Sequence, residues 1–125
     1  MGKVFPFQKG IRLRARRTGK SPESRLKGAI LDRLAWHRNI HVMCNAQDNR
    51  RLRTGLGVGS TDIVLAMAPA GRWGCLEVKL PGGKADPAQV SWMGLMKLLG
   101  CFCCVVHSPD EADEAIRRMS EGKSE

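Results

Sequence analysis

Three charged residues, Asp62, Glu77 and Lys79, stand in otherwise apolar segments of this chain. Asp62 begins the run "DIVLAMA", and the other two lie two positions apart in "WGCLEVKL". Burying a charge is costly unless the charge is paired or used. Two carboxylates on rigid strands are ligands that Mg²⁺ or Mn²⁺ favours, and the carbonyl of Val78 would add another oxygen. A lysine beside them can hold a water molecule and balance charge that grows on a phosphate.

The same pair of residues has a purely structural explanation. Glu-x-Lys pairs are common on exposed sheet faces, where a cross-strand ion pair contributes roughly a few tenths of a kcal/mol. The neighbouring sequence favours chemistry, because Asp62 precedes the pair and Gln89 follows it near the start of a helix. The amide of Gln89 is predicted to act in the site, and a role as a cap or on the helix surface is the alternative.

The elements that must position these residues follow the order helix, strand, strand, strand, helix, strand, helix, which predicts an α/β domain. Ser21 and Pro22 suit the start of the first helix, and Gly100 suits the end of the second. The predicted ranges are a helix over 21–39, strands over 40–46, 61–68 and 73–80, a helix over 86–100, a strand over 101–107 and a helix over 108–120. Residues 1–20 are predicted to be a basic arm, 21–121 one domain, and 122–125 a tail.

The second and third strands flank the turn "PAGR" and are predicted to form a hairpin. Alternation along the third strand directs Leu76, Val78 and Leu80 to the core. Glu77 and Lys79 then share the other face with Cys75. If the hairpin closes at residues 69–72, Asp62 lies within reach of Glu77.

Charge is unevenly distributed along the chain, which carries a formal net charge of +9. Residues 1–27 contain nine Lys or Arg against Glu23 alone, whereas residues 101–125 contain three basic and six acidic side chains. The basic part predicts binding to a polyanion such as DNA, and a solvated tail is the alternative for residues 9–20. The candidate phosphate contacts in this arm are Arg12, Arg14, Arg16 and Arg17.

A second basic segment, "RRLRTGLGVG", directly precedes Asp62. Its arginines can contact phosphates, and its glycines allow the backbone to approach DNA closely. A strand follows it instead of a helix, so it is no dinucleotide fingerprint. The residues assigned to DNA binding here are Arg50, Arg51, Arg53, Gly57 and Gly59.

Other candidate ligands are weaker. The five cysteines show no CxxC spacing, and "CFCCVVH" is typical of a buried strand. Zinc held by Cys103, Cys104 and His107 is a minor alternative, because adjacent strand residues point to opposite faces. Trp36 and Trp92 are expected in the core. No apolar run reaches the roughly 18 residues that a membrane span needs, so a cytoplasmic protein without a membrane partner is expected.

The pattern "GSTDIVL", "CLEVKLPGGKADPAQVSW" and "GCFCCVVHS" resembles the virus-type replication-repair nuclease (VRR-NUC) domain over about residues 21–118. This family is a branch of the PD-(D/E)XK nucleases and is related to Holliday junction resolvases. The resemblance implies a restriction-endonuclease-like core, with a mixed central sheet flanked by helices. It also suggests a bacterial or phage-like source. Thr61 stands where the family usually has proline.

The resemblance also implies roles for individual residues. Asp62 matches the metal-binding aspartate, Glu77 and Lys79 match the (D/E)XK pair, and Gln89 matches the glutamine on the next helix. Glu23 matches an acidic residue that assists the metal through water, and its position on the stripe of Leu26 and Ile30 is expected to turn it inward. A first-turn acid favoured by the helix dipole is the alternative for Glu23.

The implied activity is a Mg²⁺- or Mn²⁺-dependent endonuclease that acts on branched DNA such as Holliday junctions or flaps. A non-catalytic, basic nucleic-acid-binding module with the same fold is the alternative. A homodimer is also expected, because Trp92, Met96 and Leu99 suffice to cover the sheet. The helix carries further apolar residues, Val90, Leu95 and Leu98. Otherwise the last helix covers them, through Ala112, Ala115 and Ile116.

Overall fold

A computed structural model describes residues 21–44 and 56–125 and has the predicted order of elements. The elements are α2 (Pro22–Leu34), β1 (Ile40–Cys44), β2 (Ile63–Met67), β3 (Arg72–Val78), α3 (Pro87–Leu98), β4 (Phe102–Val106) and α4 (Pro109–Ser120). The strands form one sheet in the order β1-β2-β3-β4, antiparallel except for the parallel pair β3–β4. The expected mixed sheet flanked by helices is therefore confirmed.

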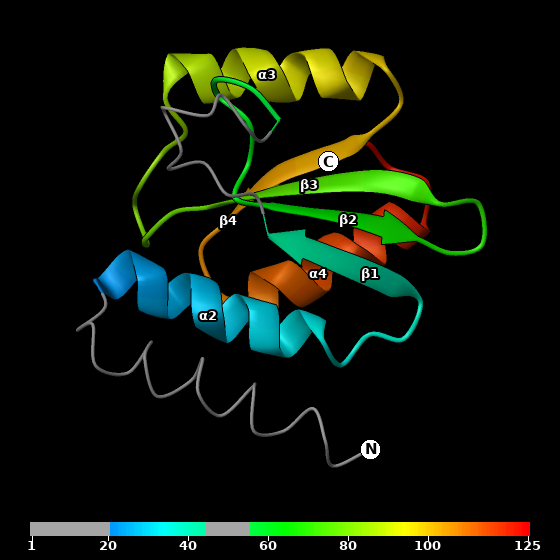
Figure 1. The fold of residues 1–125 in the computed structure, drawn as a ribbon, viewed down its shortest axis with the longest axis horizontal. Helices are drawn as coiled ribbons and strands as arrows, with labels where there is room; N and C mark the ends of the chain where they lie inside the picture. Colours follow the sequence, from blue (N-terminus) through cyan, green and yellow to red (C-terminus); the bar gives the residue numbers. More distant parts are fainter. Residues whose placement is uncertain (1–20, 45–55) are drawn as a thin grey trace.

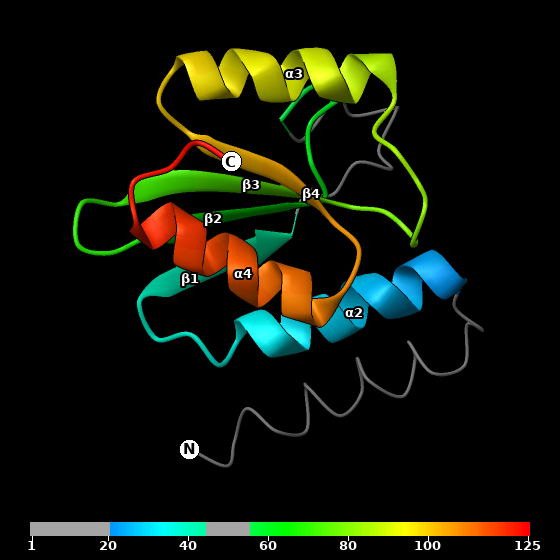
Figure 2. The ribbon, with the colours of Figure 1, turned by 180° about the vertical axis from the view of Figure 1, so that it is seen from behind.

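The helices cover the two faces of the sheet unequally. Helix α3 lies on one face, and α2 and α4 lie together on the other (Figure 1). The reverse view shows the same three layers (Figure 2). Because β4 runs parallel to β3, the chain must cross over between them, and α3 is that crossover.

The core is accordingly divided in two. The larger cluster joins α2 and α4 to the sheet and includes Leu76 and Val78. The smaller cluster lies under α3 and includes Cys75, Met93 and Cys103. The predicted alternation of β3 is thus confirmed, but both faces of the strand are covered. Leu80 is exposed, because the strand ends at Val78.

Besides that for Leu80, two further expectations about apolar side chains are wrong. Trp36 is 74% exposed, because α2 ends at Leu34 and the indole falls outside its buried stripe; the Arg33 guanidinium lies over the ring at 5.1 Å. Leu99 is also exposed, because it follows the last residue of α3, and Met93 takes its place against the sheet. Trp92 packs against the smaller cluster as expected.

The helix starts agree with the sequence signals. The hydroxyl of Ser21 accepts a hydrogen bond from the Ser24 amide, with Pro22 following. Helix α3 begins with a capping box formed by Asp86 and Gln89. Within the described ranges, no helix has the length and apolar character needed to cross a membrane.

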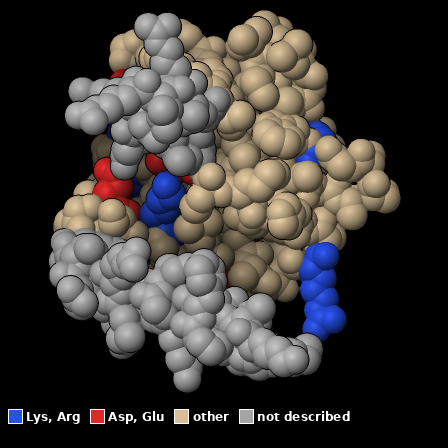
Figure 3. Space-filling view, viewed as in Figure 1, with Lys and Arg blue, Asp and Glu red and all other residues tan. Residues whose placement is uncertain are grey.

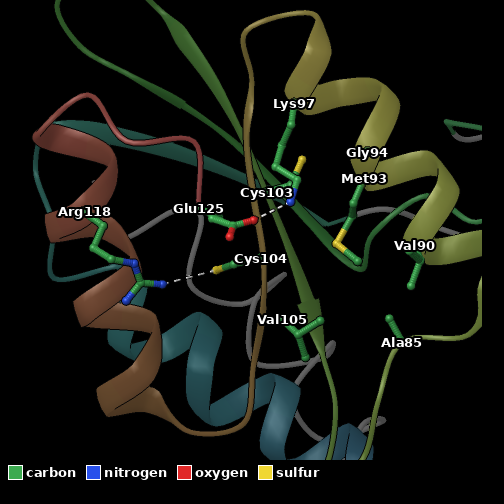
Figure 4. A pocket seen from close by; sticks show the side chains of 10 residues that line it. All are labelled: Ala85, Val90, Met93, Gly94, Lys97, Cys103, Cys104, Val105, Arg118 and Glu125. Carbon is green, nitrogen blue, oxygen red and sulfur yellow. Dashed lines mark hydrogen bonds and ion pairs between the residues drawn. The ribbon is translucent and has the colours of Figure 1, made fainter.

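The predicted tail, residues 122–125, lies along the outer edge of the sheet. The Cys103 amide donates to the Ser124 carbonyl, and the Arg72 guanidinium donates to the Lys123 carbonyl. The side chain of Lys97 pairs with Glu125 (Figure 4). These contacts cover part of the edge of β4, which no other strand pairs within the described residues. The predicted arm, residues 1–20, lies outside the described part of the chain.

Candidate functional site

The two candidate carboxylates meet where β2 begins and β3 ends. Antiparallel pairing of Ile63 with Leu76 places Asp62 beside the end of β3. There the Asp62 Oδ2 atom accepts a hydrogen bond of 3.0 Å from the Val78 amide. The hairpin closes at the predicted turn and brings Asp62 beside Glu77, as expected from the sequence. Figure 3 shows acidic and basic side chains adjoining one another on the side of the molecule where α2 and α3 begin.

Glu77 is almost fully buried, which is unusual for a carboxylate. Its side chain is 2% exposed and lies on the α3 side of the sheet. The Oε2 atom accepts from Gln89 Nε2 at 2.9 Å and lies 3.5 Å from Lys79 Nζ. The Oε1 atom is buried and has no hydrogen-bond partner within the described residues. A buried polar atom without a partner is costly, so this oxygen is a candidate ligand for a cation.

The electrostatics of the pair reflect two carboxylates held close together. Burial and, after it, the neighbouring Asp62 carboxylate raise the pKa of Glu77 to about 8, and the Lys79 ammonium partly offsets their effect. Two carboxylates held this close disfavour each other's ionisation. A divalent cation between them would remove that repulsion and give Oε1 a partner. The residues present therefore fit Mg²⁺ or Mn²⁺, with Asp62 and Glu77 as the ligands.

Gln89 forms the cap that was the alternative for it and also contacts Glu77, while its predicted role toward Lys79 or the phosphate stays a prediction. Its Oε1 atom accepts from the Asp86 amide at 2.9 Å, which closes the capping box of α3. Its Nε2 atom donates to Glu77. Because the capping bond uses the amide oxygen, the amide nitrogen must face the carboxylate. The start of α3 thus fixes one oxygen of Glu77 and leaves the other open.

A close approach between the loop before β2 and helix α3 stabilises this arrangement. Gly59 has a positive φ of +83°, and a Cβ atom there would lie 2.3 Å from the carbonyl oxygen of Ala88. Glycine is required at Gly59 by this packing, whereas the sequence suggested an approach to DNA. Gly57 also has a positive φ, but no atom of the described residues lies within 4 Å of its Cβ position, so no such packing requires glycine there.

Replacing Gly59 with Ala should destabilise the fold and reduce activity, because it separates α3 from the loop that leads into Asp62. The unfavourable φ alone costs about 1–3 kcal/mol, and the clash with backbone adds to that cost. Urea unfolding measures the effect. Gly57→Ala is the matched control, since it carries the strained φ without the clash. Equal losses in the two variants would contradict the close contact with Ala88.

Helix α2 contributes a different residue from the one predicted. Glu23 lies in the first turn, where residues 21–25 are all exposed, so the expected inward orientation is wrong. Its part in binding a metal stays a prediction. One turn further along, Lys27 reaches the site, with Nζ 3.9 Å from Asp62 Oδ1. The sequence gives no signal of this contact, because nothing in it distinguishes Lys27 from the other basic residues of the chain.

Thr61, which stands where the resembled family usually has proline, is fully buried beside the site. Its hydroxyl donates to the Ile63 carbonyl at 3.1 Å. The side chain thus hydrogen-bonds the backbone where β2 begins. The buried hydroxyl is therefore hydrogen-bonded within the same segment.

The zinc alternative is not supported by the geometry. Cys103 lies in the cluster under α3, whereas Cys104 faces α4, with its Sγ 3.8 Å from Arg118 Nη2. The His107 ring contacts the Gly83 carbonyl and Glu111, each at 3.0 Å, and these contacts raise its pKa. Across residues 21–44 and 56–125, no three His, Cys, Asp or Glu side chains form a ready-made metal cluster. Any metal must therefore take other ligands besides Asp62 and Glu77, such as the carbonyl predicted for Val78 or water.

Several predicted contacts to DNA fall outside the described residues. Arg12, Arg14, Arg16, Arg17, Arg50, Arg51 and Arg53 all belong to residues 1–20 or 45–55 and stay predictions.

Comparison with solved structures decides the fold family. A structure described as "VRR_NUC domain" superposes with a TM-score of 0.60 and 22% sequence identity, covering 78% of this chain and 97% of that one. This chain has the VRR_NUC fold. No protein-family model matches the sequence, and neither does any curated protein. The VRR_NUC fold and the restriction-endonuclease-like core expected from the sequence are thus confirmed, while the roles of individual residues rest on the geometry above.

Proposed function

We propose that this VRR_NUC-fold protein is a metal-dependent endonuclease that hydrolyses phosphodiester bonds in DNA. The observation that supports it most is the buried Oε1 atom of Glu77, which lies beside a second carboxylate and has no hydrogen-bond partner among residues 21–44 and 56–125. A module that only binds DNA gains nothing from this costly arrangement. The basic binding module that remains as the alternative would not explain why Gln89 and Lys79 both engage the other oxygen.

Each side chain has a distinct part in the proposed reaction. Asp62 and Glu77 would hold Mg²⁺ or Mn²⁺, which supplies a Lewis acid and lowers the pKa of bound water. Lys79 orients the attacking water and balances charge on the phosphate. Gln89 holds Glu77 Oε2, so that the open oxygen keeps its direction. The substrate is proposed to be branched DNA, such as a four-way junction or a flap.

Incubation with labelled four-way junction, flap, duplex and single-stranded DNA tests this function. The purified protein should cut the branched substrates with Mg²⁺ or Mn²⁺, and EDTA should stop the reaction. Cleavage of all four substrates at equal rates would contradict the proposed preference for branched DNA. DNA binding without cleavage under any metal condition would favour the non-catalytic module instead.

Binding to DNA should weaken steeply with salt if the predicted arginines neutralise phosphates. The logarithmic slope changes by about 0.9 for each phosphate contacted. Replacing Arg12, Arg14, Arg16 and Arg17 together by Gln should flatten this slope, measured by fluorescence anisotropy in EDTA. Neutralising the exposed Lys123 serves as the control and should leave it unchanged. An unaltered slope in the fourfold variant would show that the arm makes no phosphate contacts.

A homodimer is proposed from the outer face of α3. Its apolar side chains Val90, Leu95 and Leu98 are exposed, the last by 87%. Helix α4 does not cover them, because Ala112, Ala115 and Ile116 pack on the opposite face of the sheet. Sedimentation equilibrium should show a dimer that Leu98→Glu dissociates, with Val58→Glu, on an exposed loop, as control. A wild-type species of 13.8 kDa at micromolar concentration would contradict the dimer.

A further inference from the structure

Lys27 approaches the carboxylate pair from the side opposite to Gln89. Helix α2 packs on one face of the sheet, and α3, with Gln89, lies on the other. The Lys27 ammonium is 3.9 Å from Asp62 Oδ1, and its side chain is 29% exposed. Lys79, in contrast, lies next to Glu77. The two carboxylates are thus flanked by one lysine each.

One oxygen of each carboxylate already accepts a hydrogen bond from a neighbouring group. Asp62 Oδ2 accepts from the Val78 amide, and Glu77 Oε2 accepts from Gln89. The two oxygens without a hydrogen bond from the described residues, and thus the most accessible to a cation, are Asp62 Oδ1 and Glu77 Oε1. Glu77 Oε1 has no hydrogen-bond partner within the described residues, and the Lys27 ammonium lies 3.9 Å from Asp62 Oδ1.

We propose that Lys27 restricts this site to a single divalent cation. This inference rests on the proposed function, because it concerns the same metal. One ion satisfies both open oxygens. A second ion would need a place on the outer side of Asp62, where the Lys27 ammonium repels it at short range. Within the described residues, no third acidic or imidazole side chain completes a cluster there.

The position of Lys27 also gives it a part toward the substrate. In sites with two metals, the ions are about 3.5–4 Å apart and together neutralise the phosphate and the leaving oxygen. Lys27 would supply a permanent positive charge beside Asp62 in place of a second ion. As a compact ammonium on a flexible stem, it can turn from Asp62 to a phosphate once the cation neutralises that carboxylate.

Counting bound Mn²⁺ in the absence of DNA tests the inference without relying on activity. Titration calorimetry, combined with electron paramagnetic resonance of free Mn²⁺, should find one ion per wild-type chain. Lys27→Gln should still bind one ion, about tenfold more tightly, because a nearby like charge is removed. Lys27→Glu should bind two ions, because it replaces the repelling charge with a carboxylate ligand.

Arg38 provides matched controls for these changes of charge. It is exposed and follows α2. Arg38→Gln and Arg38→Glu alter the net charge equally and should leave both the number of ions and their affinity unchanged. Thermal melting in EDTA verifies that every variant is folded. If Lys27→Glu does not fold, the affinity of Lys27→Gln decides the matter.

The outcomes separate this inference from the proposed function. Two ions of similar affinity in the wild type, or an unchanged affinity in Lys27→Gln, would overturn the role of Lys27 and leave the nuclease proposal intact. No bound ion in the wild type would overturn both.

Discussion

Asp62→Asn and Glu77→Gln should each abolish DNA cleavage while leaving DNA binding nearly intact. Each change removes one of the two carboxylates that can hold the cation, without changing the shape of the side chain. Loss of a single charge-stabilising group typically lowers a rate by about 10² to 10³, and loss of a metal ligand should cost more. Lys79→Ala should lower the cleavage rate by only about 10² to 10³, because it leaves both carboxylates in place. Single-turnover cleavage of a labelled four-way junction measures the losses.

Two variants away from the site control for the change of charge. Asp110→Asn removes a carboxylate whose side chain is 91% exposed on α4. Lys123→Ala removes an exposed ammonium from the tail. Both should cleave at the wild-type rate. Wild-type cleavage by Asp62→Asn or Glu77→Gln would refute the assignment of the site, whatever the binding data show.

Glu77→Gln should also stabilise the protein in EDTA above about pH 8, where Glu77 is ionised. The wild-type side chain is buried beside a second carboxylate, and one of its oxygens has no hydrogen-bond partner in the described part of the chain. A neutral amide of the same shape removes that repulsion, which should raise the free energy of unfolding by roughly 1–3 kcal/mol. The variant should gain several degrees in melting temperature in EDTA. Conversely, Mg²⁺ should raise the melting temperature of the wild type and not that of the variant, because it binds only the folded wild-type site.

The stabilisation should depend on pH in a defined direction. The pKa of Glu77 is raised from 4.5 to about 8 in the folded protein, mainly by burial. The folded state therefore holds the proton more tightly, and the resulting stability is present below pH 4.5 and lost as the pH rises through about 8. The advantage of Glu77→Gln over the wild type should be greatest above pH 8. Glu114→Gln, on an exposed face of α4, should show no such trend. A Glu77→Gln variant less stable than the wild type at pH 9 in EDTA would contradict the prediction.

The sequence by itself determined the elements and much of the site. Helix caps at Ser21 and Asp86, and period-two alternation around the turn at residues 69–72, depend on local physical chemistry. The hairpin register follows from that turn, and the register alone brings Asp62 beside Glu77. For these reasons the order of the strands and the two carboxylates could be predicted from the sequence.

Only the tertiary structure decided which residues of distant elements reach the carboxylates. The rotation of α2 about its axis is set by packing against the sheet and α4, and it brings Lys27 to Asp62 while Glu23 stays exposed. The end of α2 at Leu34 likewise left Trp36 outside the core. The contact of Gly59 with Ala88 and the unpaired oxygen of Glu77 depend on distances of a few ångströms between segments far apart in the chain. Periodicity specifies which face of an element is buried, but packing decides which atoms meet across that face.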